Sequence, residues 1–285
     1  MFNRSAIKPH EFERPSLELH GPAIRAAFQS VVGGCEETGG IERYIDAVKL
    51  KSAMFRQALV ENDIADLDLE TFKGLCTFMA TVRRRISEHL NEEAFAGMRM
   101  AIIALFDDAE HIDDRIVRFC ERFPNDKKHR WVRDLATELL HNAEPERVPL
   151  MNRWVWDARS NTGVIREIWH GENVDHIKIP VPDRYGTYII LREELSQFLS
   201  DNGVFRDVLY YVDVLCAQVY AQYICEQGGS YLRADFQAPE DPMQHTRRLL
   251  GLDGVRPGNG RTRLKSIDGE AFVLDENSTL NQTEH

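Results

Sequence analysis

The chain has 285 residues, of which 43% are hydrophobic and 28% charged, the composition of an ordinary soluble globular protein that can bury a substantial core. It contains no run of about eighteen apolar residues and no apolar N-terminal segment, which excludes a membrane-spanning helix and a secretory signal. The net charge of −11 argues against a general nucleic-acid-binding protein, which needs basic side chains to neutralise phosphates. Five scattered cysteines without a C-x-x-C pair predict reduced thiols and a cytoplasmic location.

The first forty residues are predicted to be loop-rich. Within them, "SVVGGCEETGG" carries two glycine pairs, as a phosphate-binding loop does, but it lacks the lysine of such a loop and its two glutamates would repel phosphate. We therefore expect a flexible connection at 1–40. From residue 41 onward, apolar residues recur at spacings of three and four, which indicates helices. The helices are expected over 41–61, 68–90, 92–123, 126–141, 148–158 and 163–170.

The segment "IKIPVPDRYGTYIIL" interrupts this helical pattern. It is rich in β-branched residues and has a turn motif between two apolar runs, which predicts a short β-hairpin at 177–191. Helices are expected again over 192–201, 203–227 and 239–250. The second of these is almost entirely apolar, so we predict that it is the central helix.

The end of the chain has a different composition. "GLDGVRPGNG" is a Gly/Pro linker, "RLKSIDGEAFVL" suggests a small hairpin on an Asp-Gly turn, and the last eleven residues are expected to be disordered. The fold prediction is thus a mainly α, multi-helix single domain at 41–250 with one hairpin insert. It follows the loop-rich segment 1–40 and precedes a basic, partly flexible C-terminal arm at 251–285.

The acidic stretch "LFDDAEHIDDR", residues 105–115, resembles the aspartate-rich Mg²⁺–diphosphate motif of isoprenoid synthases. The aspartates of such a motif must line an interior cavity. On the expected helix, the apolar stripe lies opposite Asp107, Glu110, His111 and Asp114, and no second aspartate-rich motif follows in 203–227. We interpret the stretch as a solvent-exposed acidic face.

Two Glu-x-x-His signatures, Glu138–His141 and Glu167–His170, resemble the inward-facing ligand pairs of ferritin-like di-iron proteins. The two pairs are too close in sequence to leave room for the intervening helix of such a site. Both also lie away from the apolar stripe of their own expected helix. A polar face turned towards a second layer of the same protein would nevertheless form a cleft that periodicity does not reveal.

The stretch "REIWHGENVDH", residues 166–176, is the most concentrated set of chemical groups in the chain. A single-metal site of His170, Glu172 and His176, with Glu167 and Asp175 nearby, is sterically possible in a tight loop. We favour the interpretation that this stretch is a crowded polar surface, with Trp169 as its buried member because Trp169 shares a stripe with apolar neighbours.

Two features suggest a surface that binds a partner. All four tryptophans fall between residues 131 and 169, beside several arginines, and such clusters either fill a core or form a binding surface. The stretch 245–265 is strongly basic, as would suit an arm that binds an anionic partner or one that folds back on the acidic body. The candidate partner-binding residues are Trp154, Trp156, Arg159, Arg166, Arg247, Arg248, Arg261, Arg263 and Lys265.

These observations predict a soluble helical interaction or regulatory protein that binds a protein or an anionic partner, without a cofactor and without a membrane. The alternative is a metal-dependent helical enzyme that uses the His/Glu cluster around 167–176 with Fe or Zn. Bound metal would distinguish the two.

Overall fold

The computed structural model describes residues 14–36, 39–171, 174–231, 243–253, 262–265 and 271–274. Helices dominate these residues, which confirms the prediction of a mainly α protein. The α-helices are α1 (Gly21–Cys35), α2 (Glu42–Arg56), α3 (Leu69–Thr77), α4 (Glu92–Leu105), α5 (Ile112–Cys120), α6 (Trp131–Ala143), α7 (Val164–Glu167), α8 (Tyr185–Asp201), α9 (Val208–Tyr231) and α10 (Gln244–Leu249). The strands are β1 (Thr262–Lys265) and β2 (Ala271–Leu274).

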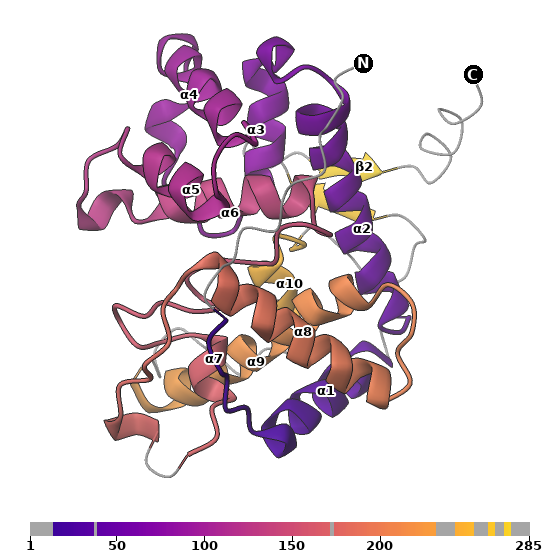
Figure 1. Ribbon diagram of the computed structural model, residues 1–285. Helices are drawn as coiled ribbons and strands as arrows, with labels where there is room; N and C mark the ends of the chain where they lie inside the picture. The colour runs from indigo at the N-terminus through magenta and orange to yellow at the C-terminus, as the bar shows by residue number, and fades with distance from the viewer. Residues whose placement is uncertain are drawn as a thin grey trace.

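The helices form two groups that share α2. Figure 1 shows α3, α4, α5 and α6 in one group and α1, α7, α8, α9 and α10 in the other. Helix α2 packs against α6 of the first group and against α9 of the second. A single hydrophobic core, which includes Phe55 of α2, runs through both groups. The helices that pack against α2 also carry the polar side chains of the candidate site described below.

The predicted loop-rich N-terminal segment is wrong in its second half, because residues 21–35 form α1. Ile24, Ala27 and Val31 are buried on one face of this helix, which packs against α9. A proline near its start is well placed, since the first turn of a helix does not need the missing N–H. Its apolar residues, at spacings of three and four, are the helical pattern that the glycine pairs obscured.

The predicted long helix over 92–123 is broken into α4 and α5. The side chain of Arg115 on α5 is buried and donates to the carbonyl of Leu105, the last residue of α4, at 3.1 Å. The carboxylate of Asp107 accepts from the backbone N–H of Ala109 at 3.1 Å, which stabilises the turn between the helices. The apolar spacing in the sequence continues across this turn, so the spacing alone does not show that the helix is interrupted.

The predicted hairpin at 177–191 is wrong. Residues 185–201 form α8, whose first turn contains Tyr185, and its backbone N–H donates to the carboxylate of Asp113 at 2.9 Å. Residues before α8 run along the protein without a strand partner, and the Val181 carbonyl accepts from the indole of Trp156 at 3.0 Å. The β-branched residues Ile189 and Ile190 are buried inside the helix, so that burial outweighs their strand propensity.

Residues 148–158, expected to be helical, form turns instead. The Asp157 carboxylate accepts from the backbone N–H groups of Arg159 and Ser160, both at 3.1 Å, and thereby bends the chain. Gly163, with a φ of 123°, lies so close to this turn that a Cβ would be 2.7 Å from the Val155 carbonyl oxygen. The turn therefore requires glycine at this position.

Helix α9 is apolar enough to be compared with a membrane span. By length and composition alone, Val208–Glu226 is one candidate among the described residues, but half of it is buried against the rest of the protein, as in a core helix. Helix α6 is the more completely buried of the two, because all of its residues except Arg133 are buried. Helix α9 nevertheless packs against α1, α2, α7, α8 and α10, as expected of a central helix.

The C-terminal arm is described only in part. Strands β1 and β2 pair antiparallel, with Thr262 opposite Leu274 and Lys265 opposite Ala271. The Asp-Gly turn proposed between them and the predicted disordered tail lie outside the described residues.

Candidate functional site: a buried polar cluster under α10

The stretch 166–176, expected to be a polar surface and in the alternative a metal site, is described in part. His170 is exposed and its ring stacks on that of His20, with 5.7 Å between the centroids. His176 is exposed as well, whereas Glu172 and the side chain of Asp175 lie outside the part of the chain that the structure describes. Within that part, no group of three or more His, Cys, Asp or Glu side chains is arranged to hold a metal ion. Trp169 is half-buried rather than buried.

The predicted tryptophan surface is wrong. Trp154 and Trp156 are buried in the core and offer no surface to a protein partner, while Arg159 is exposed and Arg166 is half-buried. The interpretation of these tryptophans as core residues is the correct one.

The basic C-terminal stretch is described at α10. Arg247 and Arg248 are half-buried there, and Arg247 donates to the hydroxyl of Tyr44 at 3.4 Å, so this part of the arm lies on the body of the protein. Arg261 and the side chains of Arg263 and Lys265 lie outside the described residues.

The acidic stretch lies at the surface as expected, but most of it forms the turn between α4 and α5 and not the face of one helix. Asp107 and Asp114 are exposed, and Glu110 and His111 are half-buried. Glu110 forms an ion pair with Arg118. The comparison with isoprenoid synthases therefore has no support from the position of these side chains.

The polar groups of α6, in contrast, face the interior. Asp134, Glu138, His141 and Asn142 are all buried, because α2, α5 and the chain after α6 cover the face that was expected to point away from the core. The prediction for Glu138 and His141 was therefore wrong, and the second layer that periodicity cannot reveal is present. These residues and their partners form the buried polar cluster.

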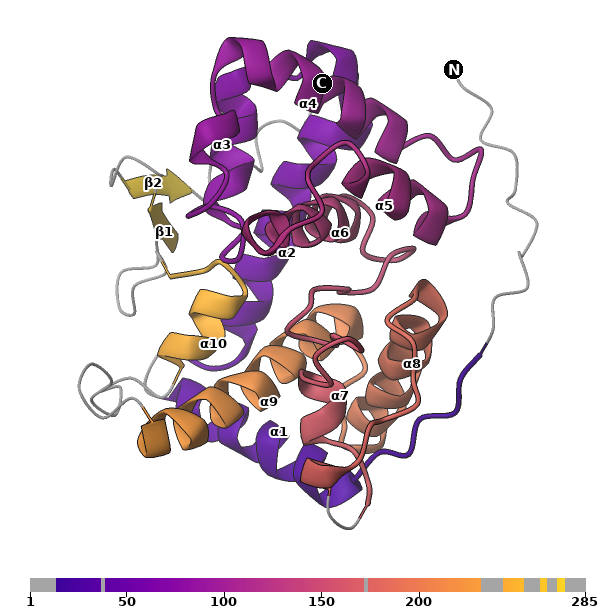
Figure 2. The same cartoon turned by 90° about the vertical axis from the view of Figure 1, so that its left-hand side faces the viewer.

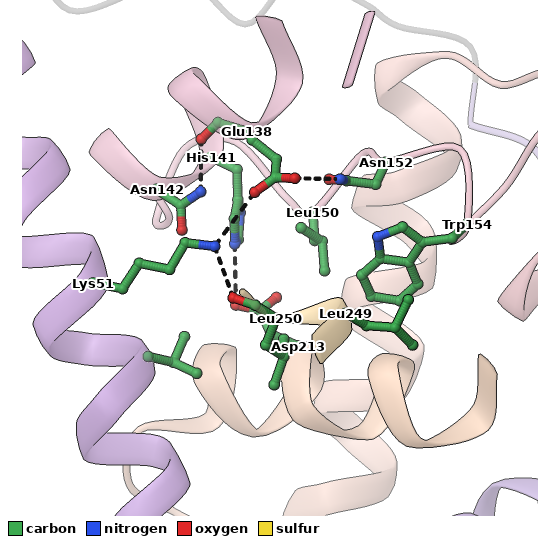
Figure 3. A pocket seen from close by; sticks show the side chains of 11 residues that line it. Lys51, Glu138, His141, Asn142, Leu150, Asn152, Trp154, Asp213, Leu249 and Leu250 are labelled. Carbon is green, nitrogen blue, oxygen red and sulfur yellow. Dashed lines mark hydrogen bonds and ion pairs between the residues drawn. The ribbon is translucent and has the colours of Figure 1, made fainter. Parts of the chain in front are cut away.

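Lys51 of α2 is the cation at the centre of this cluster (Figure 3). Its ammonium group lies 3.3 Å from the Glu138 carboxylate and 3.0 Å from the carbonyl oxygen of Leu250, which follows α10. The other carboxylate oxygen of Glu138 accepts from the amide of Asn152 at 2.9 Å. Lys51 is 5% exposed and Glu138 2%, so both charges are shielded from water and depend on each other.

Burial also affects the pKa of Glu138. Removal from water raises the pKa of this carboxyl above its ordinary value, because Lys51 and Asn152 offset only part of the cost of the buried charge. The neighbouring Asp134 is held by the guanidinium of Arg153 at 2.8 Å. A carboxyl whose pKa is raised in a buried site is one of the signs of a functional position.

His141 and Asp213 form a second pair in the same cluster. The Nδ1 atom of His141 lies 2.9 Å from the carbonyl oxygen of Val148, and Nε2 lies 3.1 Å from the Asp213 carboxylate. The carbonyl can only accept, so Nδ1 donates to it, and an ionised Asp213 accepts from Nε2; this arrangement favours the imidazolium form of the ring. Burial opposes this charge, but Asp213 and the Val148 carbonyl outweigh it, so that the pKa of His141 is raised.

A small cavity lies between these side chains and α10. Its polar lining includes Lys51, Glu138, His141 and Asp213, and its apolar lining includes Leu249 and Leu250, as Figure 3 shows. The volume of about 10 Å³ corresponds to room for about one water molecule.

Two buried polar atoms of this lining have no hydrogen-bond partner among the described residues. They are Oδ1 of Asn152, an acceptor, and Nε1 of Trp154, a donor. Buried polar groups in proteins are nearly always paired, so an unpaired donor and an unpaired acceptor on one cavity point to an occupant. That occupant needs both a donor and an acceptor of its own.

Comparisons of the chain with protein-family models, with curated proteins and with solved structures found no match. The function is therefore argued from the chemistry of the buried polar cluster alone.

Proposed function

We propose that the protein is a helical binding protein that takes a small acidic molecule into the cavity beneath α10. The observation that carries this proposal is the pair of unpartnered buried atoms, Asn152 Oδ1 and Trp154 Nε1, on the same cavity as Lys51. An ammonium has three N–H donors, and Glu138 and Leu250 use two of those of Lys51. An anionic group can therefore accept from this ammonium, either at the third donor or in place of the Leu250 carbonyl.

The arrangement also specifies the other half of the ligand. A carboxylate accepts from Lys51 and from the indole N–H of Trp154, and a neighbouring hydroxyl or amino group donates to the amide oxygen of Asn152. A small hydroxy or amino acid combines these groups. The negative charge of such a ligand disfavours the ionised form of Glu138, so we expect the ligand to bind with uptake of a proton by this carboxyl.

This proposal narrows the sequence-based prediction of a regulatory protein that binds an anionic partner: the partner is now a small acid. It replaces the tryptophan surface, since Trp154 and Trp156 are buried. The metal-dependent enzyme built on His170, Glu172 and His176 stays a prediction, and no arrangement of described residues favours it.

The proposal is tested by calorimetric titration of the purified protein with glycolate, lactate and malate. We expect saturable binding of at least one of these acids. Trp154→Phe keeps one aromatic ring and removes the unpartnered N–H together with the five-membered ring, and should weaken binding about tenfold, which is roughly the contribution of one hydrogen bond.

Trp169→Phe is the matched control, because Trp169 does not line the cavity, and it should bind as the wild type does. Absence of binding by all three acids in the millimolar range, or equal affinity of Trp154→Phe and wild type, would contradict the proposal.

A further inference from the structure

Leu250 occupies a position that a ligand oxygen would take. Its backbone carbonyl accepts from the buried ammonium of Lys51 at 3.0 Å, and the side chains of Leu249 and Leu250 close the cavity on the same side. With these groups in place, the cavity has room for about one water molecule. A hydroxy acid is several times larger and cannot enter unless this part of the chain moves.

The segment Met243–Asp253, which contains α10 and which we call the cover segment, is attached at identifiable points. Figure 2 shows α10 beside α2 and α9. Asp253 pairs with the guanidinium of Arg83, which follows α3 and donates to the carboxylate at 3.1 Å. Thr246 is hydrogen-bonded to Gln218 of α9.

Gly251 is the closest of these attachments. It has a φ of 74°, and a Cβ on it would lie 1.7 Å from the backbone oxygen of Phe78 at the end of α3. A side chain at this position therefore prevents the segment from docking in the observed way, quite apart from the backbone strain. Gly203, between α8 and α9, has a similar φ of 89° but nothing within 4 Å of a Cβ.

We propose that the cover segment is an internal cover of the Lys51 site, whose Leu250 carbonyl stands in for an oxygen of the ligand and which must lift for the ligand to enter. The inference rests on the proposed function for the identity of the ligand, but the opening itself is independent of it. When the segment lifts, Lys51 loses its hydrogen bond to the Leu250 carbonyl and becomes accessible to solvent or to a carboxylate. Water or the carboxylate then accepts the hydrogen bond that Leu250 accepted before. Binding of an acid and docking of the segment thus compete for the same donor.

The test compares Gly251→Ala with Gly203→Ala in the full-length protein. Two properties are measured by mass spectrometry: the rate at which Lys51 is acetylated by an amine-reactive acetyl ester, relative to the exposed Lys178, and hydrogen exchange of amides 243–253. In wild type, Lys51 should react slowly because it is buried. In Gly251→Ala both properties should rise, the acetylation of Lys51 at least tenfold, whereas Gly203→Ala should match wild type.

A second variant protects the test against a general loss of folding. Asp253→Asn removes the ion pair with Arg83 and leaves Phe78 and the cavity lining unchanged. It should raise both properties in the same direction by a smaller factor. If Gly251→Ala also increases hydrogen exchange throughout α6, the protein is generally destabilised, and the result for Asp253→Asn then shows whether the cover segment lifts on its own.

The outcomes separate the two proposals. Faster exchange of the segment without faster acetylation of Lys51 would show that the segment is not the cover, and unchanged exchange in both variants would show that it does not lift separately. Acetylation that rises as expected, with no binding of glycolate, lactate or malate, would leave the cover in place and overturn the proposed ligand.

Discussion

At the scale of single residues, the central feature is the buried pair of His141 and Asp213, in which each charge offsets the cost of burying the other. The imidazolium form of His141 is favoured because its ring nitrogens face the Val148 carbonyl on one side and the Asp213 carboxylate on the other. A ring in water would be mostly neutral at pH 7. The protonation state of His141 is thus a property of the fold, and stability must depend on pH through it.

Replacement of His141 by Gln should remove a specific pH dependence of stability. The pKa of His141 is raised in the folded state, so its contribution is fully present below the ordinary value of 6.5 and is lost as the pH rises through the raised value. Between pH 6 and 8 the unfolding free energy of wild type should fall, by at most about 1.4 kcal/mol per pH unit. Urea unfolding at several pH values measures it.

The matched control is His176→Gln, because His176 is exposed. It should keep the pH dependence of wild type, whereas His141→Gln should show a flatter curve whatever its absolute stability. Parallel curves for wild type and His141→Gln would contradict the assignment of an imidazolium.

At the scale of elements, polar contacts decide where helices end. These contacts involve polar residues that do not belong to the repeating apolar pattern of a helix. The buried Arg115 serves the last carbonyl of α4 and the carboxylate of Asp108, at 3.1 and 3.2 Å. Without this guanidinium, the Leu105 carbonyl would lose its side-chain donor, whereas Asp108 would keep its pair with Arg147 at 3.0 Å. The break between α4 and α5 is therefore stabilised by a side chain of the second helix.

Arg115→Met should destabilise the protein by about 1–3 kcal/mol, because the substitution preserves most of the apolar volume and leaves the Leu105 carbonyl without its donor. The control is Arg118→Met, which lies about one turn further along α5 and removes an exposed pair with Glu110. That control should have little effect. Thermal and urea unfolding of both variants would test the comparison, and equal losses would be inconsistent with it.

The same elements explain what the sequence could and could not predict. Apolar spacing identified α2, α4, α5 and α9 because one face of each is apolar over several turns. It could not locate the break before α5, the helical state of Ile189 and Ile190, or the burial of Glu138, because each depends on a contact with a distant segment. A buried lysine paired with a glutamate 87 positions away leaves no periodic signal. The sequence signal for this site was the Glu138–His141 spacing, because residues three positions apart lie close together on one helix.

At the scale of the whole molecule, α2 binds the two groups of helices together. Lys51 connects to Glu138 of α6 and to the Leu250 carbonyl, and the hydroxyl of Ser52 donates to the Asn142 carbonyl at 2.8 Å. The buried polar cluster thus lies where both groups meet α2. A ligand in the cavity would contact residues from both groups and would stabilise their association.

The prediction at this scale is that the protein unfolds in one cooperative transition. Since α2 contributes core residues to both groups, neither group keeps a complete hydrophobic face when the other unfolds. Far-ultraviolet circular dichroism reports on all helices. Tryptophan fluorescence reports on Trp131 in one group together with Trp154, Trp156 and Trp169 beside the other. The two probes should give the same midpoint in urea. Distinct midpoints, or a Ser52→Ala variant in which the two curves separate, would show instead that the groups are independent domains joined by α2.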